Sequence, residues 1–215
     1  MAAFPIDEVR SKFPGLQRMV DGRQAIFFDG PGGSQSPDSV GDAVRHYLLH
    51  QNANAGMSFA TSVETDRLID DALLACADFV GCGNHREIVF GQNMTSLTIQ
   101  LASALSRTWN PGDEVVVTRL DHDSNVRPWI LAAEWSGATL RRVDIDPDDC
   151  THNLSSLENS INENTVLVAV GAASNLSGTI NDVSGIVEKA HAVGAEVFVD
   201  AVHYAPHCLI NVEEM

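Results

Sequence analysis

From residue 87 onward, the sequence alternates short apolar runs with stretches of helical periodicity, and this pattern restricts the fold more than any other feature. The apolar runs are residues 88–90, 115–117, 140–145, 166–170 and 197–199. The helical stretches are residues 95–106, 126–136, 154–161 and 183–192. The runs are rich in β-branched residues and apolar on both faces, which is typical of parallel strands covered on both sides by helices. The sequence therefore predicts an α/β fold around a mostly parallel sheet.

The residues before this region lack the alternation. They predict a short helix at 6–13, a strand at 25–28 and a polar, glycine-rich loop at 29–35. Two amphipathic helices follow, around residues 40–48 and 69–80, each with one apolar stripe to place against a core. We divide the chain into an N-terminal arm and loop, residues 1–34, and a large domain, residues 35–215.

The charge of the chain restricts its partners. Asp and Glu number 29 against 13 Lys and Arg, a net charge of -16, and so acidic a surface repels nucleic-acid phosphates and anionic membranes. No apolar run approaches the roughly 20 residues of a membrane span, and the N-terminus lacks the apolar core of a secretory signal. The four cysteines contain no Cys-x-x-Cys pair and are expected to be free thiols. We therefore expect a cytoplasmic protein that binds neither nucleic acid nor membrane.

Polar residues gather directly after the predicted strands, where open parallel sheets bind ligands. These clusters are residues 91–96, 121–125, 174–179 and 200–207. Thr95 and Ser96 open a helix, whose free amides and dipole attract phosphate, although an ordinary helix cap has the same pattern. Five residues are expected to converge on one cleft: Thr95, His122, Asn175, Asp200 and His203.

Several roles are open for two of these residues. Asp200 could cap a helix or pair with a protonated heterocycle, and His122 could act as a base, a stacking surface, a metal ligand or a loop histidine. A metal site of Asp200, His203 and His207 is disfavoured because Pro206 interrupts its helical geometry. No Gly-x-Ser-x-Gly, Walker or Gly-x-Gly-x-x-Gly motif occurs, so neither a serine hydrolase nor a common nucleotide-binding fold is predicted.

Four ordered motifs, together with the loop at residues 28–33, resemble one known family. The motifs are residues 92–98, 120–125, 173–180 and 199–207. Their order and spacing are similar to those of the cysteine-desulfurase-like branch of class V aminotransferases, which use pyridoxal 5′-phosphate. The resemblance covers nearly the whole chain. It implies the large domain of a fold-type I pyridoxal-phosphate transferase, truncated before its last strands and without the C-terminal domain.

The resemblance also implies cofactor contacts. Thr95, with the amide after Met94, would hold the cofactor phosphate. His203, where many relatives carry Gln, would contact the phenolic oxygen of the ring. Asn175 would lie near that oxygen or near the substrate carboxylate.

Two residues would take part in catalysis as well as in binding. The resemblance implies that His122 stacks on the pyridine ring and that Asp200 pairs with the ring nitrogen. The physical chemistry agrees, because the ring withdraws electrons only while its nitrogen is protonated and a close carboxylate favours that form.

The lysine content departs from the family pattern. The family binds its cofactor covalently through a lysine that lies beyond the position of Met215, and the two lysines present, Lys12 and Lys189, do not match it. The resemblance therefore implies that residues 1–215 alone are inactive. It also implies that the predicted strand at 87–91 lacks neighbours here, because its partners follow the lysine.

The leading hypothesis is a pyridoxal-phosphate enzyme that acts on an amino acid, most simply by cysteine desulfuration, which cleaves a C–S bond. Racemases, epimerases and kynurenine-type hydrolases share the same motifs. The alternative is a truncated, non-catalytic relative that serves as a dimerisation or folding module. In a full-length form a homodimer is expected, because the family's sites form at a dimer interface.

Overall fold

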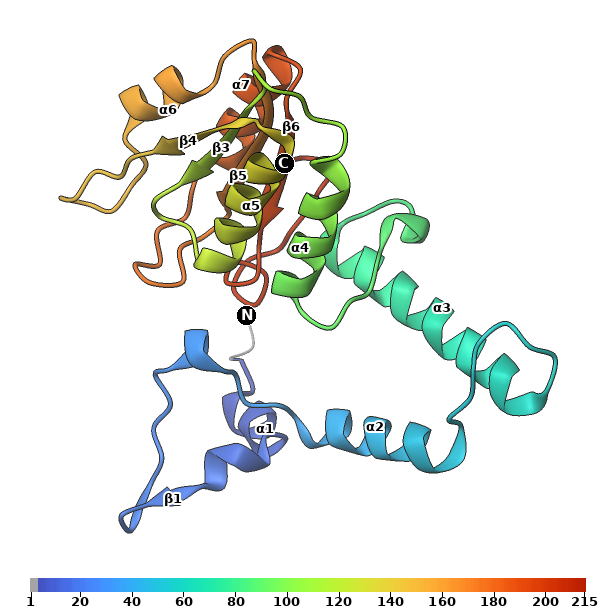
Figure 1. The fold of residues 1–215 in the computed structure, drawn as a ribbon. Coiled ribbons are helices and arrows are strands. Elements are labelled where there is room, and N and C mark those ends of the chain that lie inside the picture. The colour runs from blue at the N-terminus through green and yellow to red at the C-terminus, as the bar shows by residue number, and fades with distance from the viewer. Residues whose placement is uncertain (1–3) are drawn as a thin grey trace. The chain divides into compact units, whose positions relative to one another are not determined.

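The computed structural model describes residues 4–215, and the chain divides between Ala75 and Cys76 into two compact units (Figure 1). The elements of the first unit are α1 (Ile6–Ser11), η1 (Pro14–Gln17), β1 (Met19–Val20), β2 (Arg23–Gln24), η2 (Gly30–Gly32) and α2 (Asp38–His50). α3 (Ala60–Val80) runs from the first unit into the second. The predicted domain division at residue 34 stays a prediction.

A two-stranded hairpin occupies part of the N-terminal arm. β1 and β2 pair antiparallel around Asp21 and Gly22, whose φ angles of 51° and 74° suit the tight turn that Asp-Gly favours. The predicted strand at 25–28 is wrong, because these residues pair with no described strand and Ile26 and Phe28 are exposed. The apolar run of 25–28 therefore did not indicate a strand, whereas Asp21-Gly22 marks the turn of the hairpin that forms.

The two amphipathic patterns form helices α2 and α3, as predicted. No residue of α2 is buried, however, and its apolar stripe of Val40, Val44 and Leu48 is exposed. Periodicity therefore predicted the helix correctly but not the burial of its face. Within residues 4–215, no helix is both long enough and apolar enough to cross a membrane.

The second unit contains the predicted parallel sheet. Its strands are β3 (Glu114–Thr118), β4 (Thr139–Val143), β5 (Thr165–Gly171) and β6 (Glu196–Asp200), in the order β4-β3-β5-β6. Its helices are η3 (His85–Glu87), α4 (Met94–Leu105), η4 (Asp123–Asn125), α5 (Arg127–Ser136), α6 (Leu154–Ser160) and α7 (Val183–Ala192). All three strand pairings are parallel, so the predicted sheet type is confirmed.

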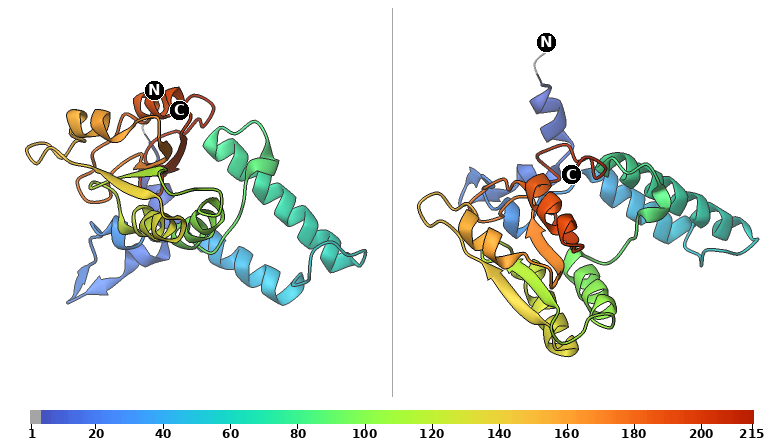
Figure 2. Two further views of the ribbon diagram at one scale, coloured as in Figure 1. Left: turned by 45° about the horizontal axis from the view of Figure 1, so that its top comes forward. Right: turned by 90° about the horizontal axis from the view of Figure 1, so that it is seen from above.

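Successive side chains of the central strands feed two separate cores, one on each face of the sheet. Val116, Val168 and Val170 pack with Ile186 and Ala190 of α7. On the opposite face, the alternate residues of β3 and β5 pack against α4 and α5. Figure 2 shows α4 and α5 on one side of the sheet and α6 and α7 on the other. Helices cover both faces, as the apolar strand runs predict.

The apolar run at residues 88–90 forms no strand. It follows η3 and pairs with none of the described strands, and Val89 and Phe90 are exposed. The expectation that this segment lacks strand neighbours is confirmed for residues 4–215. Extended backbone becomes a strand only when another strand satisfies its amides and carbonyls.

The strand order reverses between β3 and β5. From β3 the chain crosses through α5 to β4 on one side, and from β5 it crosses through α7 to β6 on the other. Such a reversal leaves a crevice beyond the carboxyl ends of the two central strands, where ligands bind in open α/β sheets. The residues after β3, β5 and β6 are therefore the candidates for a ligand-binding site.

At the amino end of β3, the buried Glu114 pairs with the half-exposed Arg141, and this ion pair should make stability depend on pH. Glu114 accepts from Arg141 Nη2 at 2.5 Å and from Asn162 Nδ2 at 2.7 Å, and its side chain is only 9% exposed. The hydrogen bond from Arg141 holds the pKa of Glu114 below its usual value, and Asn162 adds to this effect against the opposing effect of burial.

A carboxyl with a lowered pKa stabilises the fold above the usual glutamate pKa, and this stability is lost as the pH falls through the lowered value. We expect Glu114→Gln to destabilise the protein at about pH 7, with the difference from wild type narrowing towards about pH 3. Urea denaturation over this range measures it. Glu158→Gln is the control, because its pair with Lys189 is largely exposed. A pH-independent difference for Glu114→Gln would contradict the assignment.

Candidate functional site

The turn after β3 presents His122 beyond the end of the sheet. His122 caps η4, where its Nδ1 accepts from the Ser124 amide at 3.2 Å and lies 2.7 Å from Ser124 Oγ. The ring is exposed although its orientation is fixed by these two contacts. A fixed, exposed imidazole is suited to stacking on a planar ligand.

Asp121 anchors the same turn through a chain of side-chain hydrogen bonds. Its carboxylate accepts from Thr118 Oγ1 at the end of β3 and, through Oδ1, from Asn125 Nδ2 at 3.0 Å. Asn125 Oδ1 in turn accepts from Trp129 Nε1 at 3.1 Å, and both residues are fully buried. The turn is therefore tied to the core beneath it.

Asp121 and Asp200 lie close enough for their charges to interact. Burial raises the pKa of Asp121 to about 6, and the negative charge of Asp200 contributes to the rise. Hydrogen bonds from Thr118, Asn125 and the backbone of Gly171 oppose it. Asp121 belongs to the polar cluster at residues 121–125 but was not among the five predicted site residues.

Asp200 is the last residue of β6 and is half-buried. Its Oδ1 accepts from the Val202 amide at 2.9 Å, and its backbone carbonyl accepts from the Ala172 amide, next to the end of β5, at 2.8 Å. The register pairs Asp200 with Gly171. Asp200 and the turn of His122 thus lie at the same edge of the sheet.

α4 packs against η4, and its buried Ala102 shares a core cluster with Val115 and Val117 of β3. That the start of α4 lies at the same edge of the sheet stays a prediction. Asn93 caps the helix by accepting from the Ser96 amide at 2.9 Å. The exposed Thr95 is therefore not the cap, and its hydroxyl and the amides of Met94 and Thr95 remain for an anion, whereas the Ser96 and Leu97 amides donate to Asn93.

The last two predicted residues follow β5 and β6. Asn175 belongs to a tight loop in which the Ser174 amide donates to Thr179 O at 2.9 Å. His203 lies in the turn after Asp200, with its ring 5.3 Å from that of His207. Among residues 4–215, no three His, Cys, Asp or Glu side chains form a group that could hold a metal.

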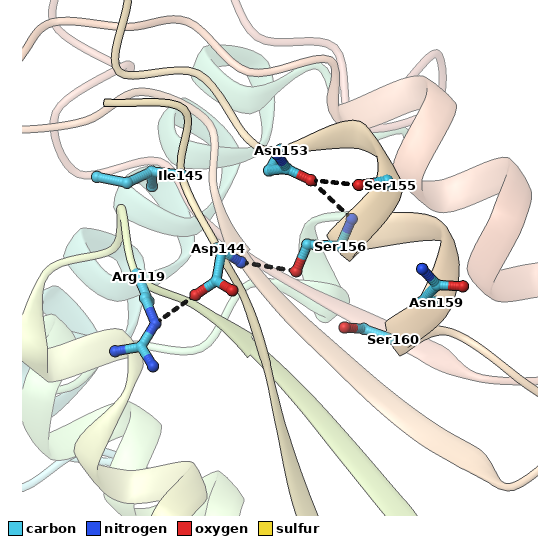
Figure 3. Close-up of a pocket in the computed structure, with 8 residues that line it drawn as sticks. All are labelled: Arg119, Asp144, Ile145, Asn153, Ser155, Ser156, Asn159 and Ser160. Atoms are coloured by element: carbon cyan, nitrogen blue, oxygen red, sulfur yellow. Dashed lines mark hydrogen bonds and ion pairs between the residues drawn. The ribbon is translucent and has the colours of Figure 1, made fainter. Parts of the chain in front are cut away.

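A separate polar pocket lies beside the edge strand β4 (Figure 3). Arg119 Nε lies 2.6 Å from Asp144 Oδ1, and Ser156 Oγ accepts from the Asp144 amide at 2.9 Å. The pocket is lined by Arg119, Asp144, Ile145, Asn153, Ser155, Ser156, Asn159 and Ser160. None of these is a predicted site residue. In Figure 3 the Arg119 and Asp144 side chains point toward each other. The two charged side chains of the pocket are therefore already paired with each other.

The groups at the sheet edge match the chemistry of a phosphorylated, protonated heterocycle. The start of α4 offers amides and a hydroxyl to a phosphate, and His122 offers a flat ring. Asp200 Oδ1 bonds Val202, and the second carboxylate oxygen can accept from a ring N–H. This donor set fits pyridoxal phosphate. That the five predicted residues surround it stays a prediction.

Comparison with known proteins gives concordant matches. The family model of "Aminotransferase class-V" matches residues 26–215. An aminotransferase-like protein of Gibberella zeae is 34% identical over 100% of this chain and 53% of its own length. A cysteine desulfurase of Dickeya dadantii is 33% identical over 99% of this chain and 52% of its own.

Solved structures give the same result. The apo structure of a cysteine desulfurase from Thermococcus onnurineus matches with a TM-score of 0.87 and 30% identity, covering 100% of this chain and 52% of that one. The chain thus spans about half the length of the curated relatives and the solved structure that it matches.

Proposed function

Since the chain belongs to the aminotransferase class-V family, we propose that it forms the cofactor-binding part of a pyridoxal-phosphate enzyme that acts on an amino acid. Its fold is the α/β large-domain fold of that enzyme class. One observation carries the proposal, namely that Asp200 and the turn bearing His122 meet at the sheet edge where the strand order reverses.

Each residue has a distinct part in the proposed site. Pyridoxal phosphate, when bound, supplies an electron sink for the bonds of an amino acid. Asp200 holds a proton on the ring nitrogen, because a nearby carboxylate favours the cationic form. His122 stacks on the ring, and Met94 and Thr95 at the start of α4 bind the phosphate. Asn175 and His203 approach the phenolic oxygen.

Within this class we propose cysteine desulfurase-like cleavage of a C–S bond. The support is that relatives named cysteine desulfurase are about one-third identical over nearly the whole chain, for example at 33% over 99% of it. The similarity to an aminotransferase-like protein agrees with the proposed cofactor and with an amino-acid substrate, but it does not favour C–S cleavage. None of the four cysteines occupies the position of the family's sulfur acceptor, so we assign that step to no residue of this chain.

The two lysines support a non-covalent mode of binding for residues 1–215. Lys189 lies in α7 with its Nζ 3.3 Å from Glu158, and Lys12 lies 3.6 Å from Glu8 in α1. Neither follows the Asp200 strand, where the family carries its lysine. We propose that this stretch alone holds the cofactor reversibly and does not turn over substrate.

The proposed oligomeric state, compartment and domain division follow those of the family. The active form is a cytoplasmic homodimer, with residues 1–34 as an arm and residues 35–215 as part of the large domain. The exposed apolar stripe of α2, formed by Val40, Val44 and Leu48, supports the expectation that more protein covers this unit.

A change of His122 tests the stacking role. His122→Phe should retain most of the affinity, because a flat ring still stacks, while changing the absorbance of the bound ligand. His122→Ala should weaken binding by up to about tenfold, the contribution of one aromatic stack. Calorimetry with pyridoxine 5′-phosphate measures both, since this alcohol cannot couple to lysines. Binding that a chelator abolishes would instead identify His122 as a metal ligand.

A further inference from the structure

The Asp121 carboxyl occupies a space that the backbone of β5 leaves open for it. A Cβ on Gly171 would lie 2.7 Å from Asp121 Oδ1, which is too close for a side chain other than hydrogen. The close approach therefore depends on glycine at a position whose backbone conformation does not itself require it. Gly171 is also the register partner of Asp200, so it neighbours both Asp121 and Asp200.

The groups around Asp121 come from four elements. β3 contributes Thr118, η4 contributes Asn125, β5 contributes the backbone of Gly171, and β6 contributes Asp200. Among these, Asp200 is the titratable group. Three of the contacts are thus neutral donors that hold the carboxyl in place, and the fourth is a like charge.

We propose that Asp121 is a positioning residue of the site, which fixes the turn that carries His122 and adds a second negative charge behind Asp200. The inference rests on the proposed function. Asp121 would act through its neighbours and not by contact with the ligand, because its oxygens accept hydrogen bonds from Thr118 and Asn125.

The charge of Asp121 has a defined effect on a cationic ligand. When Asp121 is neutral, Asp200 alone faces a protonated ring nitrogen. When Asp121 ionises, the second negative charge strengthens the attraction for that cation. By reciprocity, a bound cation must favour the ionised form of Asp121 by the same factor. The pKa of Asp121, about 6, places this change between mildly acidic and neutral pH.

The test compares the whole 215-residue chain with Asp121→Asn, Asp200→Asn and Gly171→Ala, and with Asp123→Asn as the control from the same turn. Carboxyl ¹³C NMR follows the titration of Asp121, and calorimetry with pyridoxine 5′-phosphate follows affinity against pH. Comparison with Asp121→Asn at each pH cancels the titration of the ligand itself.

We expect the Asp121 midpoint to lie near 6 and to move to lower pH in Asp200→Asn and on addition of pyridoxine 5′-phosphate. Wild type should bind about fivefold more tightly than Asp121→Asn at neutral pH, at the lower end of usual coupling between sites, and equally at about pH 5. Gly171→Ala keeps the charge but displaces the carboxyl, so it should also lose the pH-dependent gain. Asp123→Asn should behave as wild type.

Two results would overturn the proposal: an Asp121 midpoint unchanged in Asp200→Asn, or a ratio of affinities that does not vary with pH. A purely structural role for Asp121 would weaken binding equally at all pH values. If the folded chain bound no pyridoxine 5′-phosphate at any pH, the proposed function would fail, while the NMR midpoints would still decide the coupling. If Asp121→Asn did not fold, Gly171→Ala and Asp200→Asn would decide it.

Discussion

Replacing Trp129 with alanine is expected to lower the free energy of unfolding by about 3–5 kcal/mol, the usual cost of removing a large buried aromatic side chain. Trp129 is fully buried on the face of the sheet covered by α4 and α5. Its ring lies 5.0 Å from that of Phe198 in an edge-on arrangement. The change also leaves the buried Asn125 Oδ1 without its donor, which adds to the cost.

Trp135 provides the matched control. It lies on the same helix, α5, but is 55% exposed, so Trp135→Ala should change stability far less. Chemical denaturation followed by circular dichroism measures both variants. Equal losses for the two tryptophans would contradict the core assigned to this face. Since Trp129 holds Asn125, and Asn125 holds Asp121, Trp129→Ala should also disturb the turn of His122.

Replacing Asp200 with asparagine is expected to weaken binding of pyridoxine 5′-phosphate by about ten- to a hundredfold at neutral pH. Asparagine keeps the size of the side chain and its bond to the Val202 amide. It removes the charge that holds the proton on the ring nitrogen. The loss should be smaller for a ligand methylated at the ring nitrogen, which has no proton to donate.

Glu196→Gln is the control for this charge change. Glu196 is exposed at the amino end of the same strand, β6, away from the proposed site. Calorimetry of the two variants at one pH separates a local effect from a general loss of negative charge. Equal weakening by both changes would mean that the ligand senses only the net charge, and the role of Asp200 would be wrong.

Much of the second unit could be predicted because its signals are local. The β-branched runs of β3 and β5 are apolar on both faces, and this pattern gave both the parallel sheet and its covering by helices. The runs at 25–28 and 88–90 are similarly apolar yet form no strand. A strand requires a partner, and pairing is a long-range property that a local run does not contain.

The places of Asp200 and His122 after strand runs could be predicted from the sequence, but the hydrogen bonds around Asp121 could not. Asp200 and His122 were predicted as site residues because each follows a strand run, and open parallel sheets bind ligands beyond the carboxyl ends of their strands. Asp121 was missed because its importance comes from Thr118, Asn125 and the bare backbone of Gly171, which come from three different elements. Burial of one particular carboxyl depends on packing that the sequence alone does not display.

We propose that the groups at the carboxyl ends of the strands bind pyridoxal phosphate. Amide NMR spectra of the ¹⁵N-labelled chain, recorded during titration with pyridoxine 5′-phosphate, test it most directly. We expect saturable shifts at the start of α4, at residues 121–125 and at residues 200–203, and in Asp200→Asn all three sets should need about ten- to a hundredfold more ligand to saturate. Saturable shifts confined to the β4 pocket of Arg119 and Asp144, or no shifts in a folded chain, would contradict it.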